Sequence, residues 1–216
     1  KETTWNKPVM QRFFKVNGDI FVRTFLLTLV SSFFTFASSG MGDTILAVNA
    51  LLMQFFMLFS YFMDGFAYAG EALTGRFVGA KNKEYLQWMI RRIFFWGLVV
   101  SLAAVVIYSL FPSQILRIMT NDVLIIERAK DFMFWTVLIP VVGFAAFLWD
   151  GIFIGATASR QMRNAMVYSS GIFFACYFAF TPLWGNNGLW LSFILYLLVR
   201  GLMQTVWAKK ALRIKA

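Results

Sequence analysis

Six long apolar runs divide this chain and constrain its fold more than any other feature. A helix needs about 20 apolar residues to cross the hydrocarbon core of a bilayer, and each run is close to that length. The runs cover residues 20–41, 44–74, 93–111, 132–158, 165–183 and 189–207. Only helices and closed barrels satisfy their backbone hydrogen bonds in lipid, and these runs lack the apolar–polar alternation of barrel strands. The sequence therefore predicts an all-α, polytopic membrane protein built as a six-transmembrane-helix bundle.

The composition agrees with a protein that faces lipid. Charged residues make up 14% of the chain, against about 25% in a typical soluble domain. The 20 Lys and Arg residues outnumber the 10 Asp and Glu, but they lie in short clusters between the apolar runs. That pattern is typical of membrane anchors rather than of a nucleic-acid-binding surface. The chain has no histidine and one cysteine, Cys176, so we expect neither a metal site nor a cofactor.

The distribution of basic residues predicts the orientation and the domain organisation. Of the 20 Lys and Arg residues, 15 lie on the side of the two termini and three on the opposite side. By the positive-inside rule, both termini face the cytoplasm, as expected in a cytoplasmic (inner) membrane. We expect a cytoplasmic interfacial linker at 1–17, the six-helix lobe at 18–208 and a basic cytoplasmic tail at 209–216. Because the chain begins at Lys1 rather than Met, we also expect it to be a piece of a longer protein.

Four ionisable residues inside the apolar runs are candidates for transport or gating: Asp64, Glu71, Asp150 and Arg200. Each costs at least about 2.5 kcal/mol to insert into the membrane and so needs a reason to be there. At a rise of about 1.5 Å per residue, both aspartates lie roughly 27–30 Å from the outer boundary, in the cytoplasmic third. Arg200 lies nearer the middle, and Glu71 follows Asp64 by seven positions on nearly the same helix face.

Two interpretations of these residues remain open. The carboxylates can form a proton relay or an acidic site for a cation or cationic drug. Alternatively, they form a structural ion pair or helix clamp, with Arg200 bound to Asp150 or Asp64 and Arg76 reaching Asp64 from the end of its helix. The depth of the two aspartates favours a clamp near the inner gate, and simple solvation is the favoured explanation for Glu71.

Small polar residues form a second pattern. Hydroxyl side chains recur along the first apolar run at spacings of 4, 3, 4 and 3, which places them on one helix face. Such a face can line a wet pathway or can let two helices approach closely, and two amides in the second run are equally ambiguous. The resulting candidates for lining a cavity are Thr28, Ser31, Thr35, Asn49 and Gln54.

Several short stretches, in order along the chain, carry a family resemblance. They are NGDIFVRT at 17–24, AVNA at 47–50, DGFAYA at 64–69, EA at 71–72, DGIFIGAT at 150–157, MRN at 162–164 and RG at 200–201. Taken together, their order and spacing resemble the second half of the multidrug and toxic compound extrusion (MATE) family, in its DinF-like branch. Asp64, Glu71, Asp150 and Arg200 all match positions of these motifs.

The resemblance implies one six-helix lobe of a two-lobed secondary transporter, and not an enzyme. Such transporters export organic, often cationic, compounds in exchange for protons or sodium. The implied partners are the lipid bilayer, a missing N-terminal six-helix lobe and a small organic substrate. In the DinF-like branch, the acidic residues usually credited with proton coupling lie in the first half, so the resemblance assigns that role to no residue of this chain.

Two other functions can be compared with this interpretation. A lipid-linked oligosaccharide flippase has a related architecture but needs a large cationic cavity, for which Arg200 is the only support in the sequence. An intramembrane aspartyl protease would use two aspartates that share a proton. That class expects a Gly-x-Gly-Asp signature, whereas Phe147-Leu148-Trp149 precedes Asp150.

Overall fold

A computed structural model describes residues 7–212, which form helices and no strand. Within that range, six helices are long and apolar enough to cross a membrane. They are α1 (Lys7–Ser39), α2 (Asp43–Gly79), α3 (Lys83–Leu110), α6 (Met133–Gly155), α7 (Ser159–Trp184) and α8 (Asn186–Ala211). Two short helices, α4 (Pro112–Met119) and α5 (Val123–Lys130), connect α3 to α6. The all-α, six-span fold predicted from the sequence is confirmed.

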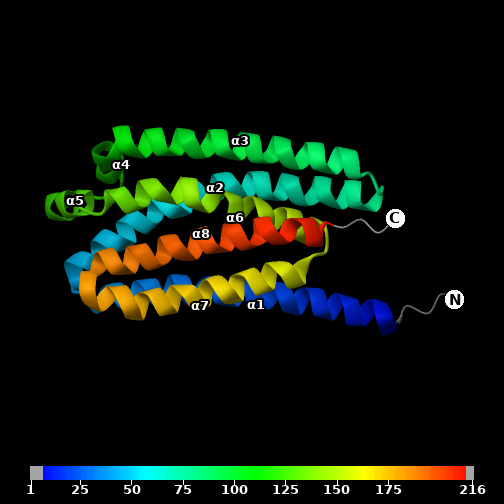
Figure 1. The fold of residues 1–216 in the computed structure, drawn as a ribbon. Coiled ribbons are helices and arrows are strands. Elements are labelled where there is room, and N and C mark those ends of the chain that lie inside the picture. Colours follow the sequence, from blue (N-terminus) through cyan, green and yellow to red (C-terminus); the bar gives the residue numbers. More distant parts are fainter. Residues whose placement is uncertain (1–6, 213–216) are drawn as a thin grey trace.

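The spans run antiparallel to one another in chain order. The start of α1 and the end of α8 lie at the same end of the bundle, here called the terminal end, whereas α4 and α5 lie at the opposite, distal end (Figure 1). The central helix is α6, which packs against α2, α3 and α8. On the other side, α7 packs against both α1 and α8. The core of the lobe is therefore built around α6 and α8.

The helices extend beyond the apolar runs at the terminal end. Residues 7–17, which we expected to form a separate interfacial linker, are the first turns of α1. Residues 1–6 of that linker and 213–216 of the expected basic tail lie outside the described residues. At the same end, α2 continues to Gly79, and the side chain of Asn82 caps α3 by accepting a hydrogen bond from the backbone N–H of Tyr85 at 3.1 Å. The helices α1 and α2 thus continue past their apolar runs at this end, and a polar side chain caps the start of α3.

Glycines bring α6 very close to α2. A Cβ atom on Gly151 would lie 2.0 Å from the carbonyl oxygen of Ala67, and one on Gly155 would lie 2.2 Å from the carbonyl oxygen of Glu71. Small residues spaced four apart allow two helix backbones to approach in this way. This contact fixes the position of Asp150, the neighbour of Gly151, relative to α2.

We predict that Gly151→Ala destabilises the lobe, whereas Gly171→Ala does not. The added methyl group of Gly151→Ala meets backbone atoms of α2, and such overpacking costs about 1–3 kcal/mol. At Gly171 nothing lies within 4 Å of the position that an added Cβ atom would take, and alanine is the better helix former. Thermal unfolding in detergent, followed by size-exclusion chromatography, measures both effects. Equal melting temperatures for the two variants would contradict the close contact between α2 and α6.

Candidate functional site

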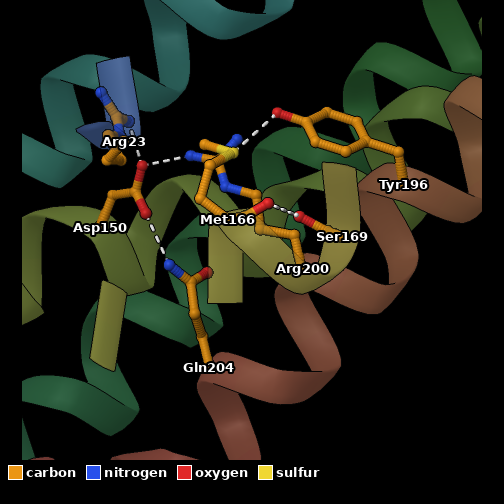
Figure 2. Close-up of polar contacts among 7 residues, drawn as sticks. All are labelled: Arg23, Asp150, Met166, Ser169, Tyr196, Arg200 and Gln204. Carbon is orange, nitrogen blue, oxygen red and sulfur yellow. Dashed lines mark hydrogen bonds and ion pairs between the residues drawn. The ribbon is translucent and has the colours of Figure 1, made fainter. Parts of the chain in front are cut away.

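Three helices converge on the carboxylate of Asp150 (Figure 2). The Oδ2 atom accepts hydrogen bonds from Nη2 of Arg23 on α1 and from Nη2 of Arg200 on α8. The Oδ1 atom accepts a hydrogen bond of 2.6 Å from Nε2 of Gln204, one turn further along α8. Arg23, Asp150, Arg200 and Gln204 are called the ion cluster below.

The burial of the ion cluster makes its internal pairing necessary. Asp150 is 4% exposed and Arg200 is 1% exposed. An isolated ion at such a position costs several kcal/mol, and this cost is offset only when a partner of opposite charge and further hydrogen bonds are in place. The guanidinium carbon of Arg200 also lies 5.9 Å from the ring centroid of Phe147, a cation–π distance. The pairing of Arg200 with Asp150, one of the pairs expected from the sequence, is present.

Asp64 and Glu71 do not join this cluster by contact. Asp64 is part-buried on α2 and close enough to interact electrostatically with Arg23, Asp150 and Arg200. Within residues 7–212, however, it has no hydrogen bond or ion pair, contrary to the expectation that each aspartate has a bound partner. Arg76 is exposed and forms no ion pair with it, because it lies more than three helical turns beyond Asp64 toward the end of α2. Glu71 likewise forms no ion pair with any described residue.

Arg23 is the functional residue that the sequence analysis missed. Counted from the start of the apolar run at residue 20, it falls at the membrane edge. Because α1 begins at Lys7, Arg23 lies near the middle of the helix and reaches Asp150 on α6. A basic residue inside a motif-bearing stretch, 17–24, was the available signal.

A second tie holds α1 at the terminal end. The carboxylate of Asp19 is buried, and its Oδ1 atom accepts a hydrogen bond of 2.5 Å from Nη1 of Arg163. Its Oδ2 atom accepts one of 2.8 Å from the hydroxyl of Ser159, at the start of α7. Asp19 and Arg163 lie in two of the stretches that carry the family resemblance, which gives these motif positions a structural reason.

A groove of about 230 Å³ lies between α1 and α2 in the distal half of the lobe. Ser31, Thr35, Asn49 and Gln54, four of the five residues considered as cavity lining, lie on its walls together with methionine and phenylalanine side chains. Thr28 is exposed on α1 and is not part of the wall. No charged side chain lines this groove in the described part of the chain.

The two amides of the groove differ in their bonding. Asn49 and Asn186 exchange reciprocal amide hydrogen bonds of 2.7 and 2.9 Å. Asn49 also donates to the hydroxyl of Ser38 at 2.7 Å and accepts from the indole N–H of Trp190 at 2.9 Å. Gln54 is exposed and forms no hydrogen bond with any residue between 7 and 212. Asn49 therefore holds α1, α2 and α8 together, whereas the amide of Gln54 is available to a ligand.

This geometry leaves little support for the two other functions. Both carboxylate oxygens of Asp150 are occupied by cationic or amide donors, so the residue cannot share a proton with Asp64 as a protease dyad requires. Arg200 is buried and does not line the groove, so it supplies no cationic cavity for an oligosaccharide diphosphate. Among residues 7–212, no group of three His, Cys, Asp or Glu side chains could hold a metal ion.

The comparisons with known proteins agree with the fold and with the family resemblance. The profile of the MatE family matches residues 20–181. The chain belongs to the MatE family. DNA damage-inducible protein F of Escherichia coli is 35% identical over 209 residues, which cover 96% of this chain and 45% of that protein.

Two solved transporters share the fold of this MatE chain. One is an outward-facing multidrug resistance MATE family transporter of the MOP superfamily, with a TM-score of 0.79 and 19% identity over 91% of this chain and 44% of that one. The other is a MOP superfamily transporter from Pyrococcus furiosus described as having a binding pocket of reverse polarity, with a TM-score of 0.78 and 20% identity over the same shares. The chain thus spans about half the length of these proteins. Since its relatives are membrane transporters, the expectations of a multi-pass membrane protein and of a non-enzyme are confirmed.

We predict a distinct order of stability losses among variants of the ion cluster. Asp150→Asn leaves two guanidinium groups without their counter-charge, and breaking a buried pair costs about 3–5 kcal/mol. Arg200→Gln should cost nearly as much, and Arg23→Gln less, because the side chain of Arg23 is 22% exposed against 2% for Arg200. Asp64→Asn, which breaks no ion pair of the described residues, serves as the matched control and should change stability little. Melting temperatures in detergent measure this order, and a larger loss for Asp64→Asn than for Asp150→Asn would contradict it.

Proposed function

We propose that this chain is one lobe of a secondary active efflux transporter that exchanges organic, often cationic, compounds for protons or sodium. The groove between α1 and α2 is the observation that carries the proposal. It combines the uncharged polar side chains of Ser31, Thr35 and Gln54 with the adaptable apolar surfaces of Met53 and Phe56. Sites for drug-sized ligands are mostly apolar with a few polar groups that orient the ligand, and methionine adapts to ligands of different shape.

In this proposal, the groove forms one wall of the substrate cavity and is not itself a closed cavity. Thr35 and Gln54 are exposed side chains within membrane-spanning helices. The hydroxyl of Thr35 donates to the carbonyl oxygen of Ser31 at 3.3 Å, but contact with lipid alone would leave the amide of Gln54 unsatisfied. A second six-helix lobe of the same transporter, placed against α1 and α2, would cover them and complete a substrate cavity. The neutral character of this wall suits organic cations and uncharged amphiphiles, which need no counter-charge from this lobe.

The ion cluster serves as a clamp in this proposal, and not as the proton carrier. Protonation of Asp150 would leave Arg23 and Arg200 charged and without a counter-ion in a buried site, which opposes proton uptake. Asp64 differs, because it lies near the cluster without an ion pair to any described residue. Of the two aspartates on α2 and α6 that the sequence singles out, Asp64 is therefore the one left for proton exchange.

We further propose that the terminal end of the lobe faces the cytoplasm, in a cytoplasmic (inner) membrane. The support is the excess of Lys and Arg, 15 against three, on the side of the termini. The turn between α4 and α5 then lies outside the cell, and the ends of α3 and α7 nearest the termini lie inside.

Cysteine labelling tests this orientation. In a Cys176→Ser background, we expect Asn121→Cys, in the turn between α4 and α5, to react with an impermeant maleimide in intact cells. Lys83→Cys and Arg160→Cys, at the starts of α3 and α7, should react only after the cells are permeabilised. All three positions are exposed at their respective ends. Labelling of Asn121→Cys and Lys83→Cys from the same side would contradict the antiparallel arrangement, and reversed labelling would contradict the orientation.

Efflux measurements test the groove. In the full-length protein, Gln54→Leu should raise the KM for ethidium roughly two- to tenfold, the effect of losing one hydrogen bond worth about 0.5–1.5 kcal/mol. The matched control is Gln114→Leu, an exposed glutamine on α4 that does not line the groove. Expression and melting temperature should stay at the level of the wild type in both variants. An equal change in KM for both variants would contradict a substrate site in this groove.

A further inference from the structure

A cavity of about 400 Å³ opens at the terminal end, between α3 and α8. Its floor is Trp149 of the central helix α6, and its side walls include Leu86 and Ile90 of α3 and Leu212 at the end of α8. The cavity lies where α3, which begins at Lys83, extends beyond the end of α6 at Gly155 toward the terminal end (Figure 1). We call this cavity the lysine notch, because Lys83 of α3 and Lys209 of α8 contribute to its lining from two different helices.

The lysine notch has a cationic lining over an apolar interior. None of the described residues that line it is acidic. Glu84, which follows Lys83, lies instead on a neighbouring surface with Tyr85 and Trp88. The indole N–H of Trp149 is already donated to the hydroxyl of Thr205 at 2.8 Å, so the floor offers no free donor to a ligand. The lysine side chains are therefore the charged groups available for recognition.

We propose that the lysine notch binds an anionic phospholipid of the surrounding bilayer. Its phosphate lies between Lys83 and Lys209, and one acyl chain follows the apolar wall formed by Leu86, Ile90 and Leu212. The notch lies at the ends of membrane-spanning helices, the level at which lipid headgroups are found, and basic pockets between such helices are known lipid-binding places. The apolar wall favours a lipid over a free phosphate ion, which would leave that wall without a partner.

Binding of this lipid has a structural consequence. The helices α3 and α8 each pack against α6, and the notch forms a gap between them at the terminal end. A lipid phosphate that bridges Lys83 and Lys209 joins the helix ends across this gap. The inference depends on the membrane-spanning fold, and neither on the proposed orientation nor on the transport activity.

Native mass spectrometry of the full-length protein tests the proposal. We expect phosphatidylglycerol to remain bound after delipidation in preference to phosphatidylcholine. A lysine near an anionic lipid surface raises affinity about fivefold, so Lys83→Gln with Lys209→Gln should weaken retention about 25-fold. The matched control, Lys81→Gln with Lys210→Gln, removes the same charge from exposed neighbours that do not line the notch and should change retention less than about twofold.

Equal losses in the two double variants, or no preference for phosphatidylglycerol in the wild type, would overturn the site. An equal rise in the melting temperature of the protein with inorganic phosphate and with phosphatidylglycerol would show that the notch binds a free anion rather than a lipid.

If the notch variant does not fold, brominated phosphatidylglycerol provides a test on proteins with both lysines intact. It should quench tryptophan fluorescence more than brominated phosphatidylcholine does, and this excess should disappear in Trp149→Phe; persistence of the full excess in that variant would overturn the site.

Discussion

Asp150 lies in the central helix α6 and is 4% exposed, and an unpaired carboxylate at such a position would cost several kcal/mol. Its counter-charges come from α1 and α8, so the lobe reaches low energy only when these two helices and α6 are placed together. The next residue, Gly151, meets the backbone of α2. Asp150 and Gly151 of α6 therefore fix the positions of α1, α2 and α8 relative to α6, which together are four of the six spans.

The groove depends on the same constraint, although the ion cluster lies nearer the terminal end. Of the ties that hold α1, two lie on either side of the groove residues: the bond from Arg23 to Asp150, and the bond from Asn49 to Ser38 in the distal half. Ser31 and Thr35 lie between these ties and face the groove. The width of the groove is therefore set by the ion cluster beyond it and by the bond between Asn49 and Ser38 in its wall, and Gln54 takes part in neither contact.

The sequence predicted well what depends on one helix at a time. Run length and charge indicated the six spans, and the insertion cost of charged residues pointed to Asp150 and Arg200, which are paired. It did not predict contacts that depend on which helices are neighbours. Arg23 and Asp150 are 127 residues apart, and periodicity identifies a helix face without identifying what it meets. For the same reason the pairing expected for Asp64 was wrong, and the amide exchange between Asn49 and Asn186, which are 137 residues apart, was missed.

In the proposed function, the ion cluster is a clamp whose charge takes no part in transport. Replacing a buried ion cluster by apolar residues of similar volume is often neutral for stability, whereas breaking it is not. The decisive measurement is therefore efflux per folded molecule of full-length protein carrying Arg23→Met, Asp150→Leu, Arg200→Met and Gln204→Leu together. The clamp predicts a folded protein whose ethidium efflux stays within about threefold of the wild type. A folded, monodisperse protein that has lost proton- or sodium-driven efflux would contradict it.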